Sequence, residues 1–285
     1  MDNQIATVVI VPSVGRVMQF RFHGGNDVFW ENPSLAGKSQ DPAATEWSNF
    51  GGDKAWPSPE GEWGRYTGNN KWKPPSGFDG QPATASREGN EVVLYSAVDA
   101  FYGIQVMRRV HLEEKQPRMT ITTTFKRVKG APAKLGIWTV TQLRHPEGIF
   151  VAIPKNSRMA NGFVPLMVPA PPSIKLEGQI LSLARDQQAA FKIGTEASTL
   201  LWVGTTEMLG IESRRVSGRQ YPDQGSSAEV YTSPNPLEYI ELEMLGPLET
   251  LKTGEQITRV NTYTLYRRVL SNPDVEARVI LSKSQ

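Results

Sequence analysis

The chain has 285 residues, three histidines, no cysteine and a formal net charge of +2. Without cysteine, disulfides, thiolate metal sites and thiol nucleophiles are excluded. The small net charge is spread along the chain, so no basic surface typical of nucleic-acid or anionic-lipid binding is indicated. Hydrophobic residues make up 39% and charged residues 21% of the chain, which is ordinary globular usage and argues against disorder or a fibrous repeat.

A short apolar run, Ile5 to Val11, stands near the start and is interrupted by Pro12. Because no basic region precedes it, this run indicates a strand and not a secretion signal. A processed periplasmic or secreted chain would show the same features, so the compartment stays open. No run reaches the roughly 18 apolar residues that a membrane-spanning helix requires, and no membrane insertion is expected.

Four of the seven tryptophans fall between Trp47 and Pro75, in a segment rich in Gly, Pro and Asn that predicts a loop. Within it Asp53, Lys54 and Trp56 follow a double glycine, where the backbone can approach a ligand closely. Aromatic faces beside fixed charges are typical of sugar-binding surfaces, because the C–H faces of a sugar stack on the rings while its hydroxyls bond to charged groups. The alternative is a lid of rings folded over the core of an all-β protein.

Strand patterns dominate the remaining sequence. Apolar residues alternate with threonine from Arg118 to Lys126, which indicates a half-buried strand. In the run from Tyr239 to Met244, Glu241 and Glu243 share one face, which is either solvent-exposed or part of a cleft. Further predicted strands cover Val92 to Val98, Gly103 to Leu112, Leu135 to Leu143, Ile149 to Ile153, Thr199 to Val203 and Ile257 to Tyr266. These runs predict a large antiparallel all-β fold.

Two other segments have distinct signals. Asn272-Pro273-Asp274 offers a cap and a first-turn proline before Val275 to Ile280, which predicts a short helix near the end. The stretch from Val164 to Ser173 has four prolines and predicts an extended loop, with a polyproline ligand for a partner module as the alternative.

Acid–base candidates begin with the three histidines, since the common catalytic sequence motifs are missing. His111 shares a strand face with Arg109, whose charge would lower the pKa of the imidazole, although a solvated sheet face explains the pair equally well. His145 begins a turn after a strand, with Glu147 close enough to orient it. His23 lies in a turn, where it can face a ligand or cap a hairpin.

Carboxylates are the other acid–base candidates. Glu212, Asp223 and Glu229 flank a basic loop, Arg214 to Arg219. For Arg214 and Arg215 in that loop we expect a solvated run of charge.

Several fragments carry a resemblance to a known family: Pro12 to Met18, Trp30 to Pro33, Gly51 to Pro57, Tyr102 to Val106 with Arg108 to Val110, and Glu241 to Glu243 leading to Gly246-Pro247-Leu248, Leu251 and Gly254-Glu255. In their order along the chain they resemble the galactose mutarotase-like superfamily, which includes the aldose 1-epimerases, and in particular its DUF4380-type branch. The resemblance implies an antiparallel β-supersandwich with little helix, a single domain over residues 1–285, and a sugar-sized concave cleft.

One departure from the family pattern affects mechanism. Epimerases of this fold resemble one another in a central-strand histidine that protonates the ring oxygen and a late glutamate that takes the anomeric proton. The comparable strand here, Leu135 to Gln142, has no histidine, so the acid is missing or replaced. The resemblance suggests Glu229 as the base, with Glu212 as a competitor. His111 or His145 would supply the acid only if the curvature of the sheet brings one of them into the cleft.

The first functional hypothesis is therefore a protein that binds a mono- or oligosaccharide. An aldose 1-epimerase-like isomerase is the alternative, and a non-catalytic accessory or scaffold domain is the second alternative. No cofactor, metal or nucleic acid is expected, and the oligomeric state stays open. The candidate catalytic residues are Glu229, His111 and His145, and the candidate sugar contacts are Asp53, Lys54, Trp56, Arg109, Trp138 and Gln142.

Overall fold

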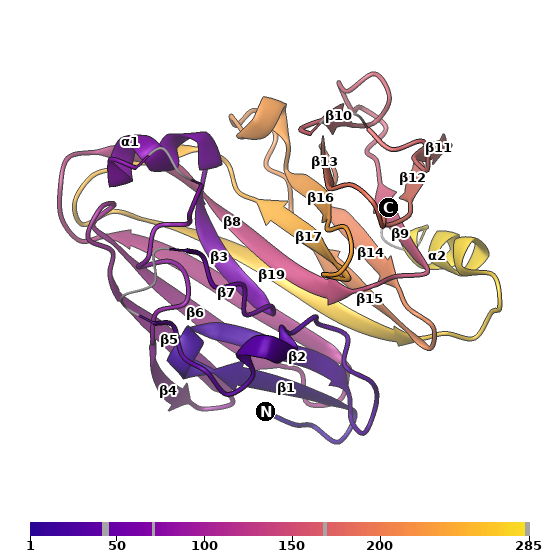
Figure 1. Ribbon diagram of the computed structural model, residues 1–285, viewed down its shortest axis with the longest axis horizontal. Helices are drawn as coiled ribbons and strands as arrows, with labels where there is room; N and C mark the ends of the chain where they lie inside the picture. Colours follow the sequence, from indigo (N-terminus) through magenta and orange to yellow (C-terminus); the bar gives the residue numbers. More distant parts are fainter. Residues whose placement is uncertain (42–45, 70–71, 168–169, 283–285) are drawn as a thin grey trace.

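The computed structural model describes residues 1–41, 46–69, 72–167 and 170–282, which form two antiparallel β-sheets packed on one another (Figure 1). Within this part of the chain the first sheet has nine strands. Their order is β1 (Ala6–Val11), β2 (Arg16–Phe22), β3 (Asp53–Ser58), β8 (Ala133–Arg144), β17 (Tyr239–Leu245), β16 (Ala228–Thr232), β13 (Phe191–Thr195) and β10 (Val164–Pro165), with β18 (Glu249–Leu251) pairing β8.

The second sheet has ten strands among the described residues. Their order is β11 (Lys175–Glu177), β12 (Ile180–Leu183), β9 (Gly148–Ala152), β14 (Thr199–Val203), β15 (Glu207–Glu212), β19 (Gln256–Arg267), β7 (Arg118–Arg127), β6 (Ile104–Leu112), β5 (Glu91–Val98) and β4 (Thr84–Glu88). The two sheets confirm the predicted all-β, antiparallel supersandwich. No helix in the described part of the chain has the length and apolar character needed to cross a membrane.

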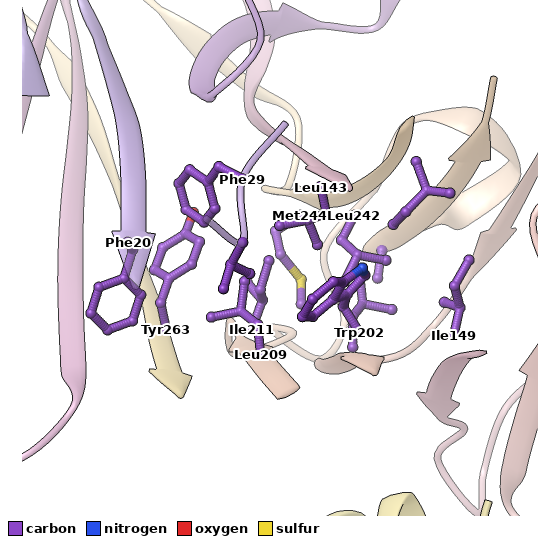
Figure 2. Packing of buried hydrophobic residues seen from close by; sticks show 14 of the residues in the cluster. Phe20, Phe29, Leu143, Ile149, Trp202, Leu209, Ile211, Leu242, Met244 and Tyr263 are labelled. Atoms are coloured by element: carbon purple, nitrogen blue, oxygen red, sulfur yellow. The ribbon is translucent and has the colours of Figure 1, made fainter. Parts of the chain in front are cut away.

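The main core lies between the two sheets (Figure 2). Leu143 and Leu242 come from the first sheet, and Ile149, Leu209 and Tyr263 from the second; all five are fully buried. Each such aliphatic side chain stabilises the fold by about 1.5–3 kcal/mol when it leaves water. Because strand side chains alternate between faces, the residues between these positions in the first sheet point away from the core.

Strand β3 corrects the expectation of a loop across the tryptophan-rich segment. Asp53 to Ser58 pair with β8 along their whole length, whereas β2 pairs with β3 only between Val17 and Asp53. Pro57 therefore lies in a stretch of β3 that has a paired neighbour on one side alone, where a missing N–H is tolerated. Composition favoured a loop, but pairing with a long central strand determines the structure of these six residues.

The double glycine before β3 serves the fold. Gly51 and Gly52 have φ values of 90° and 70°, which L side chains rarely adopt. A Cβ atom at Gly51 would lie 2.2 Å from the carbonyl oxygen of Trp30, and one at Gly52 would lie 2.7 Å from that of Val17. The close approach expected from the sequence is thus made to neighbouring backbone.

Helices are few, and two lie at informative places. The predicted C-terminal helix is confirmed as α2 (Pro273–Leu281), whose cap residue Asn272 accepts hydrogen bonds from the backbone of Asp274 and Val275. Helix α2 packs on β14 and β9, whereas the short α1 (Trp63–Thr67) follows β3 (Figure 1). In the proline-rich stretch, β10 forms the start, and residues 168 and 169 lie outside the described residues.

Candidate functional site

The outer face of the first sheet carries polar and aromatic side chains where its inner face carries the core. The register of the strands places Trp56 opposite Trp138 and Gln142 opposite Glu241. Further along the sheet, Glu243 of β17 lies opposite Glu229 of β16, and Tyr231 of β16 lies opposite Lys192 of β13. One face of five neighbouring strands therefore combines carboxyl, ammonium, amide and aromatic groups.

Above this face lies a cleft of about 580 Å³. Its lining joins residues from the sheet with residues from four connecting segments. They are Trp47, Trp56, Glu60, Gly61, Trp72, Trp138, Leu166, Met167, Lys192, Asp223, Tyr231, Tyr239 and Glu241. A volume of this size lies within the range of small-molecule pockets.

Tryptophan rings form one wall of the cleft. The Trp56 ring lies 5.2 Å from Trp138 and 5.8 Å from Trp47, both edge to face, and Trp47 lies 5.1 Å from Trp72. Edge-to-face pairs at these separations add about 0.5–1.5 kcal/mol to the burial of the rings. Trp56 is almost fully buried, whereas Trp72 is 50% exposed. The segment therefore both packs as a lid and presents aromatic surface to the cleft.

Lys192 connects two acidic side chains at the floor of the cleft. Its Nζ lies 2.7 Å from Glu229 Oε2 and 3.0 Å from Glu243 Oε2. The indole N–H of Trp138 also donates to Glu243 Oε2, at 2.6 Å. Glu229 and Glu243 have no exposed surface. Buried carboxyl groups are therefore held by one ammonium group and one aromatic donor.

Burial and crowding change the proton affinities of this floor. Burial raises the pKa of Glu229 well above its usual range, against the effect of Lys192, and the nearby charges of Glu243 and Asp223 raise it further. Burial also raises the pKa of Asp223, and the charge of Lys192 opposes this shift. Burial alone would lower the pKa of Lys192, but Glu229 and Glu243 hold it well above its usual range. The site thus combines an ammonium ion with two carboxyl groups, those of Glu229 and Asp223, whose pKa values are raised.

A second charged group lies beside the first, around Lys54. Its Nζ is 3.8 Å from Glu241 Oε1, and the same oxygen accepts a 2.9 Å hydrogen bond from Gln142 Nε2. Burial lowers the pKa of Lys54 to about 8, against the attraction of Glu241. Burial likewise raises the pKa of Glu241 to about 7, with Lys54 opposing and Glu243 adding to the shift. Glu241 therefore titrates near neutrality on the lining of the cleft.

Several buried polar atoms around the cleft have no hydrogen-bond partner within the described residues. They include Trp56 Nε1, Lys54 Nζ, Gln142 Oε1 and Glu243 Oε1. A buried polar atom left without a partner costs about 1–3 kcal/mol. Among these residues Trp56 lines the cleft, so its indole N–H is a donor that a polar molecule bound there could use.

Five of the nine residues that the sequence proposed for the site lie on one face. Lys54, Trp56, Trp138, Gln142 and Glu229 all lie on the outer face of the first sheet, and Trp56 and Trp138 line the cleft directly.

Asp53 lies on the opposite face of β3, in the core between the sheets. Its carboxylate pairs with Arg108 and accepts 2.6 Å hydrogen bonds from Thr141 Oγ1 and from the Tyr263 hydroxyl. Neighbouring strand residues point to opposite faces, so Lys54 and Asp53 cannot both reach the cleft. Asp53 belongs to the fold and not to the site.

The histidine candidates lie outside the cleft. His111 and Arg109 do share a face of β6, but it is the solvent side of the second sheet, where Arg109 pairs with Glu88 and Glu91. His145 lies past the end of β8, where Arg185 Nε donates to its Nδ1 at 2.7 Å. Burial and then the charge of Arg185 lower the pKa of His145. The structure therefore brings neither His111 nor His145 to the cleft.

Sequence reasoning missed two charged residues of the site. Lys192 lies on the five-residue strand β13, while Glu60 begins a 3₁₀ turn (Glu60–Glu62) after β3. Asp223, one of the carboxylate candidates beside the basic loop, lines the cleft. The pairing of β13 with β16 places Lys192 beside Glu229, and that long-range pairing had no local signal in the sequence.

A larger concavity of about 1180 Å³ lies beside the basic loop and has a different character. Arg158 and Arg215 on its surface both pair with Glu196 at 2.9 Å, and Arg215 lies over the Tyr221 ring. Glu212, the competitor of Glu229, is exposed there. Its buried carboxyl group, Glu196, is paired with two arginines that hold its pKa below the usual range against the effect of burial, whereas burial raises the pKa values of the carboxyl groups at the cleft. In the described part of the chain, no group of three or more His, Asp and Glu side chains is arranged to hold a metal ion.

Comparison with solved structures identifies the fold. A galactose mutarotase-like protein from Lactobacillus casei has a TM-score of 0.62 at 11% identity, over 93% of this chain and 99% of that chain. A galactose mutarotase related enzyme from Lactobacillus acidophilus has a TM-score of 0.56 at 10% identity, over 93% and 96% of the two chains. A TPR-domain containing protein from Parabacteroides distasonis has a TM-score of 0.61 at 13% identity, over 95% of this chain and 47% of that one.

These likenesses show that the chain has the galactose mutarotase-like fold, as the sequence fragments implied. No protein-family model matches the sequence, and no curated protein matches it. Because identity is low, the likeness gives the fold alone, and function has to be argued from the cleft.

Proposed function

We propose that this protein binds a sugar in the cleft above the first sheet. The observation that carries the proposal is the combination of tryptophan rings with carboxyl and ammonium groups on the lining of one cleft of about 580 Å³. A sugar has an apolar C–H face and a rim of hydroxyls, so it can use both kinds of surface at once.

The individual contacts follow from the geometry. Trp72 and Trp138 would stack on the sugar ring, because both line the cleft. Trp56 Nε1, buried and without a partner among the described residues, would donate to a sugar oxygen. Glu241 would accept from hydroxyls, and Lys54 and Gln142 behind it keep its carboxylate oriented.

Sugar binding is tested with a panel of mono- and oligosaccharides, measured by thermal unfolding and by ligand-observed NMR. A sugar present at about 100 times its dissociation constant should stabilise the protein by roughly 2.7 kcal/mol. The variant Trp72→Ala should weaken binding, since this ring is half exposed and lines the cleft. Phe101→Ala is the matched control, because Phe101 is 46% exposed but does not line the cleft. No stabilisation by any sugar would overturn the proposal.

A second candidate function is a sugar epimerase or mutarotase, favoured by the carboxyl groups whose pKa values are raised around Lys192 and Lys54. Opening of a sugar ring needs an acid that protonates the ring oxygen and a base that takes the anomeric hydroxyl proton. The C1–O5 bond then breaks as the C1=O1 bond forms, and closure on the other face reverses both steps. No external oxidant or reductant is required.

In this candidate function Glu241 is the relocated acid, because it lines the cleft and its pKa is raised to about 7. Glu229 is the base, and Asp223, which lines the cleft and whose charge raises the pKa of Glu229, passes the proton between Glu229 and the sugar. Polarimetry of freshly dissolved hexoses, pentoses and uronates tests the reaction. The rate should fall on Glu229→Gln and on Glu241→Gln and persist on His111→Asn and His145→Asn. A mutarotation rate equal to that in buffer alone would exclude the epimerase activity but would not affect the proposal that the protein binds a sugar.

A further inference from the structure

The rim of the cleft holds two acidic side chains that have no basic partner. Glu60 and Asp223 both line the cleft, and within the described residues neither has a Lys, Arg or His nitrogen within 4.0 Å. Burial raises the pKa of each, and Asp223 adds to the shift of Glu60. The nearest compensating charge is Lys192, which already contacts Glu229 and Glu243. The rim is therefore short of positive charge.

The charges of the whole site are unbalanced in the same sense. Two ammonium groups, Lys54 and Lys192, face the carboxyl groups of Glu229, Glu241 and Glu243 as well as those at the rim. Protonation of some of these carboxyl groups is one way to relieve the repulsion. A cation supplied by a ligand is the other, and it would need no proton.

The aromatic surface of the cleft suits a cation as well. Lys192 Nζ lies 4.3 Å from the centre of the Trp138 ring, and Lys54 Nζ lies 4.9 Å from that of Trp56. Ammonium groups over tryptophan faces are attracted by the electron-rich ring. The exposed faces of Trp47, Trp72 and Tyr231 border the same space, so a ligand cation would meet further rings of this kind.

The backbone at Asp223 supports a role beyond packing. Asp223 and Gln224 have φ values of 46° and 60°, in a region that non-glycine residues adopt at a cost of about 1–3 kcal/mol. Trp56 Nε1, 2% exposed as a side chain and without a hydrogen-bond partner among the described residues, also borders the cleft. Strained backbone that holds a carboxyl group at the rim, together with an unused buried donor, points to a bound molecule.

Building on the proposed sugar binding, we propose that the cleft prefers a sugar with a free amino group, whose ammonium ion is bound by Glu60 and Asp223. The sugar ring would use the tryptophan faces, and the ammonium group would supply the missing positive charge at the rim. N-acetylation removes that charge and adds bulk, so an N-acetylated sugar would lose the advantage.

The test compares three matched ligands at pH 7 by calorimetry or ligand-observed NMR: glucosamine, glucose and N-acetylglucosamine, with the galactose series alongside. We expect the amino sugar to bind about tenfold more tightly than its neutral parent, the size of a single cation–π or charge contact of about 1–2 kcal/mol. Equal or weaker binding of the amino sugar would overturn this inference while leaving sugar binding in place. Failure of every sugar to bind would overturn the proposed function itself.

Variants locate the cation. Glu60→Gln and Asp223→Asn should each reduce the preference for the amino sugar and leave the affinity for the neutral sugar nearly unchanged. Glu62→Gln is the control, because Glu62 lies in the same 3₁₀ turn but pairs with Arg65 at 3.0 Å and does not line the cleft. A preference that survives both Glu60→Gln and Asp223→Asn would show that these residues do not bind the ammonium group.

Discussion

Trp138 and Glu243 are joined across neighbouring strands by a 2.6 Å hydrogen bond from the indole N–H to the carboxylate. One ring thus lines the cleft and also holds a buried carboxylate against Lys192. The tryptophan wall and the charged floor of the cleft are therefore joined by a hydrogen bond. A substitution in one should alter the stability and the ligand binding of the other.

Replacing Trp138 with Phe tests this link. The variant keeps an aromatic face but removes the donor to Glu243, so we expect a loss of about 1–3 kcal/mol in the free energy of unfolding, together with weaker sugar binding. Urea denaturation and the sugar titration measure the two effects. Trp202→Phe is the control, because Trp202 donates to the carbonyl of Arg144 at 2.8 Å in the main core. It should lower stability and leave sugar affinity unchanged.

Lys192→Met removes the ammonium group that Glu229 and Glu243 share. Two buried carboxyl groups then lack a counter-charge, so we expect a loss of about 3–5 kcal/mol at pH 8. Because carboxyl groups with raised pKa values favour the folded state when protonated, the loss should shrink as the pH falls toward 5. Urea denaturation at both pH values checks this. Lys134→Met, at an exposed lysine, should have little effect, and an equal loss at both pH values would contradict the assignment.

Glu241 should make the free energy of unfolding of the wild-type protein depend on pH, and a neutral residue at this position should remove that dependence. Its pKa is about 7 in the folded protein against a usual 4.5, so its contribution to stability is complete below 4.5 and is lost as the pH rises through 7. Glu241→Gln should therefore gain stability relative to the wild type between pH 5 and 7.5, on the order of 3 kcal/mol at most.

Lys54 adds to the stability that Glu241→Gln is expected to gain over the wild type as the pH rises. Its pKa, about 8 in the wild type, would fall further without Glu241, and a lowered lysine pKa favours the folded state as the pH rises. Denaturation curves across the window measure the difference between the two proteins. Glu114→Gln, at an exposed position, should run parallel to the wild type; parallel behaviour of Glu241→Gln would contradict the expectation.

Asp53→Asn distinguishes a core residue from a sugar contact. The change leaves Arg108 buried beside a neutral group, so we expect a loss of about 3–5 kcal/mol in the free energy of unfolding. Sugar affinity of the folded variant should equal that of the wild type. Asp27→Asn is the comparison, because Asp27 forms a surface pair with Arg144 that should contribute about 0–1 kcal/mol. If Asp53→Asn instead kept its full stability and lost sugar affinity, Asp53 would have to be a sugar contact.

Local patterns in the sequence predicted the strands that alternate clearly. The strict alternation from Tyr239 to Met244 indicated β17 and put Glu241 and Glu243 on one face, and the cap at Asn272 indicated α2. Whether that face met solvent or a cleft depended on β16 and β13, which pair with β17 in series. Such pairings join residues far apart in sequence, and the sequence of one strand does not predict which strands pair with it.

The same limit explains the misplaced candidates. Alternation correctly put Arg109 and His111 on one face of β6, but nothing within the strand tells which face the other sheet covers. Asp53 and Lys54 are both candidate sugar contacts because they follow the double glycine. Neighbouring residues of a strand point to opposite faces, so one of the two has to point to the core. Lys192, Glu60 and Asp223 lie in short elements whose sequences resemble ordinary surface segments.

The cleft takes its tryptophan rings from the first half of the chain, and apart from Lys54 and Glu60 it takes its charged side chains from the second half. Trp47, Trp56, Trp72 and Trp138 all precede residue 140, whereas Lys192, Asp223, Glu229 and Glu243 all follow residue 190. During synthesis the tryptophan residues of the cleft leave the ribosome first. The charged residues that follow position 190 leave it only when β13, β16 and β17 are made. A nascent or truncated chain would therefore present a tryptophan surface with only Lys54 and Glu60 of the site's charged groups, and the other charged groups are added in the last third of translation.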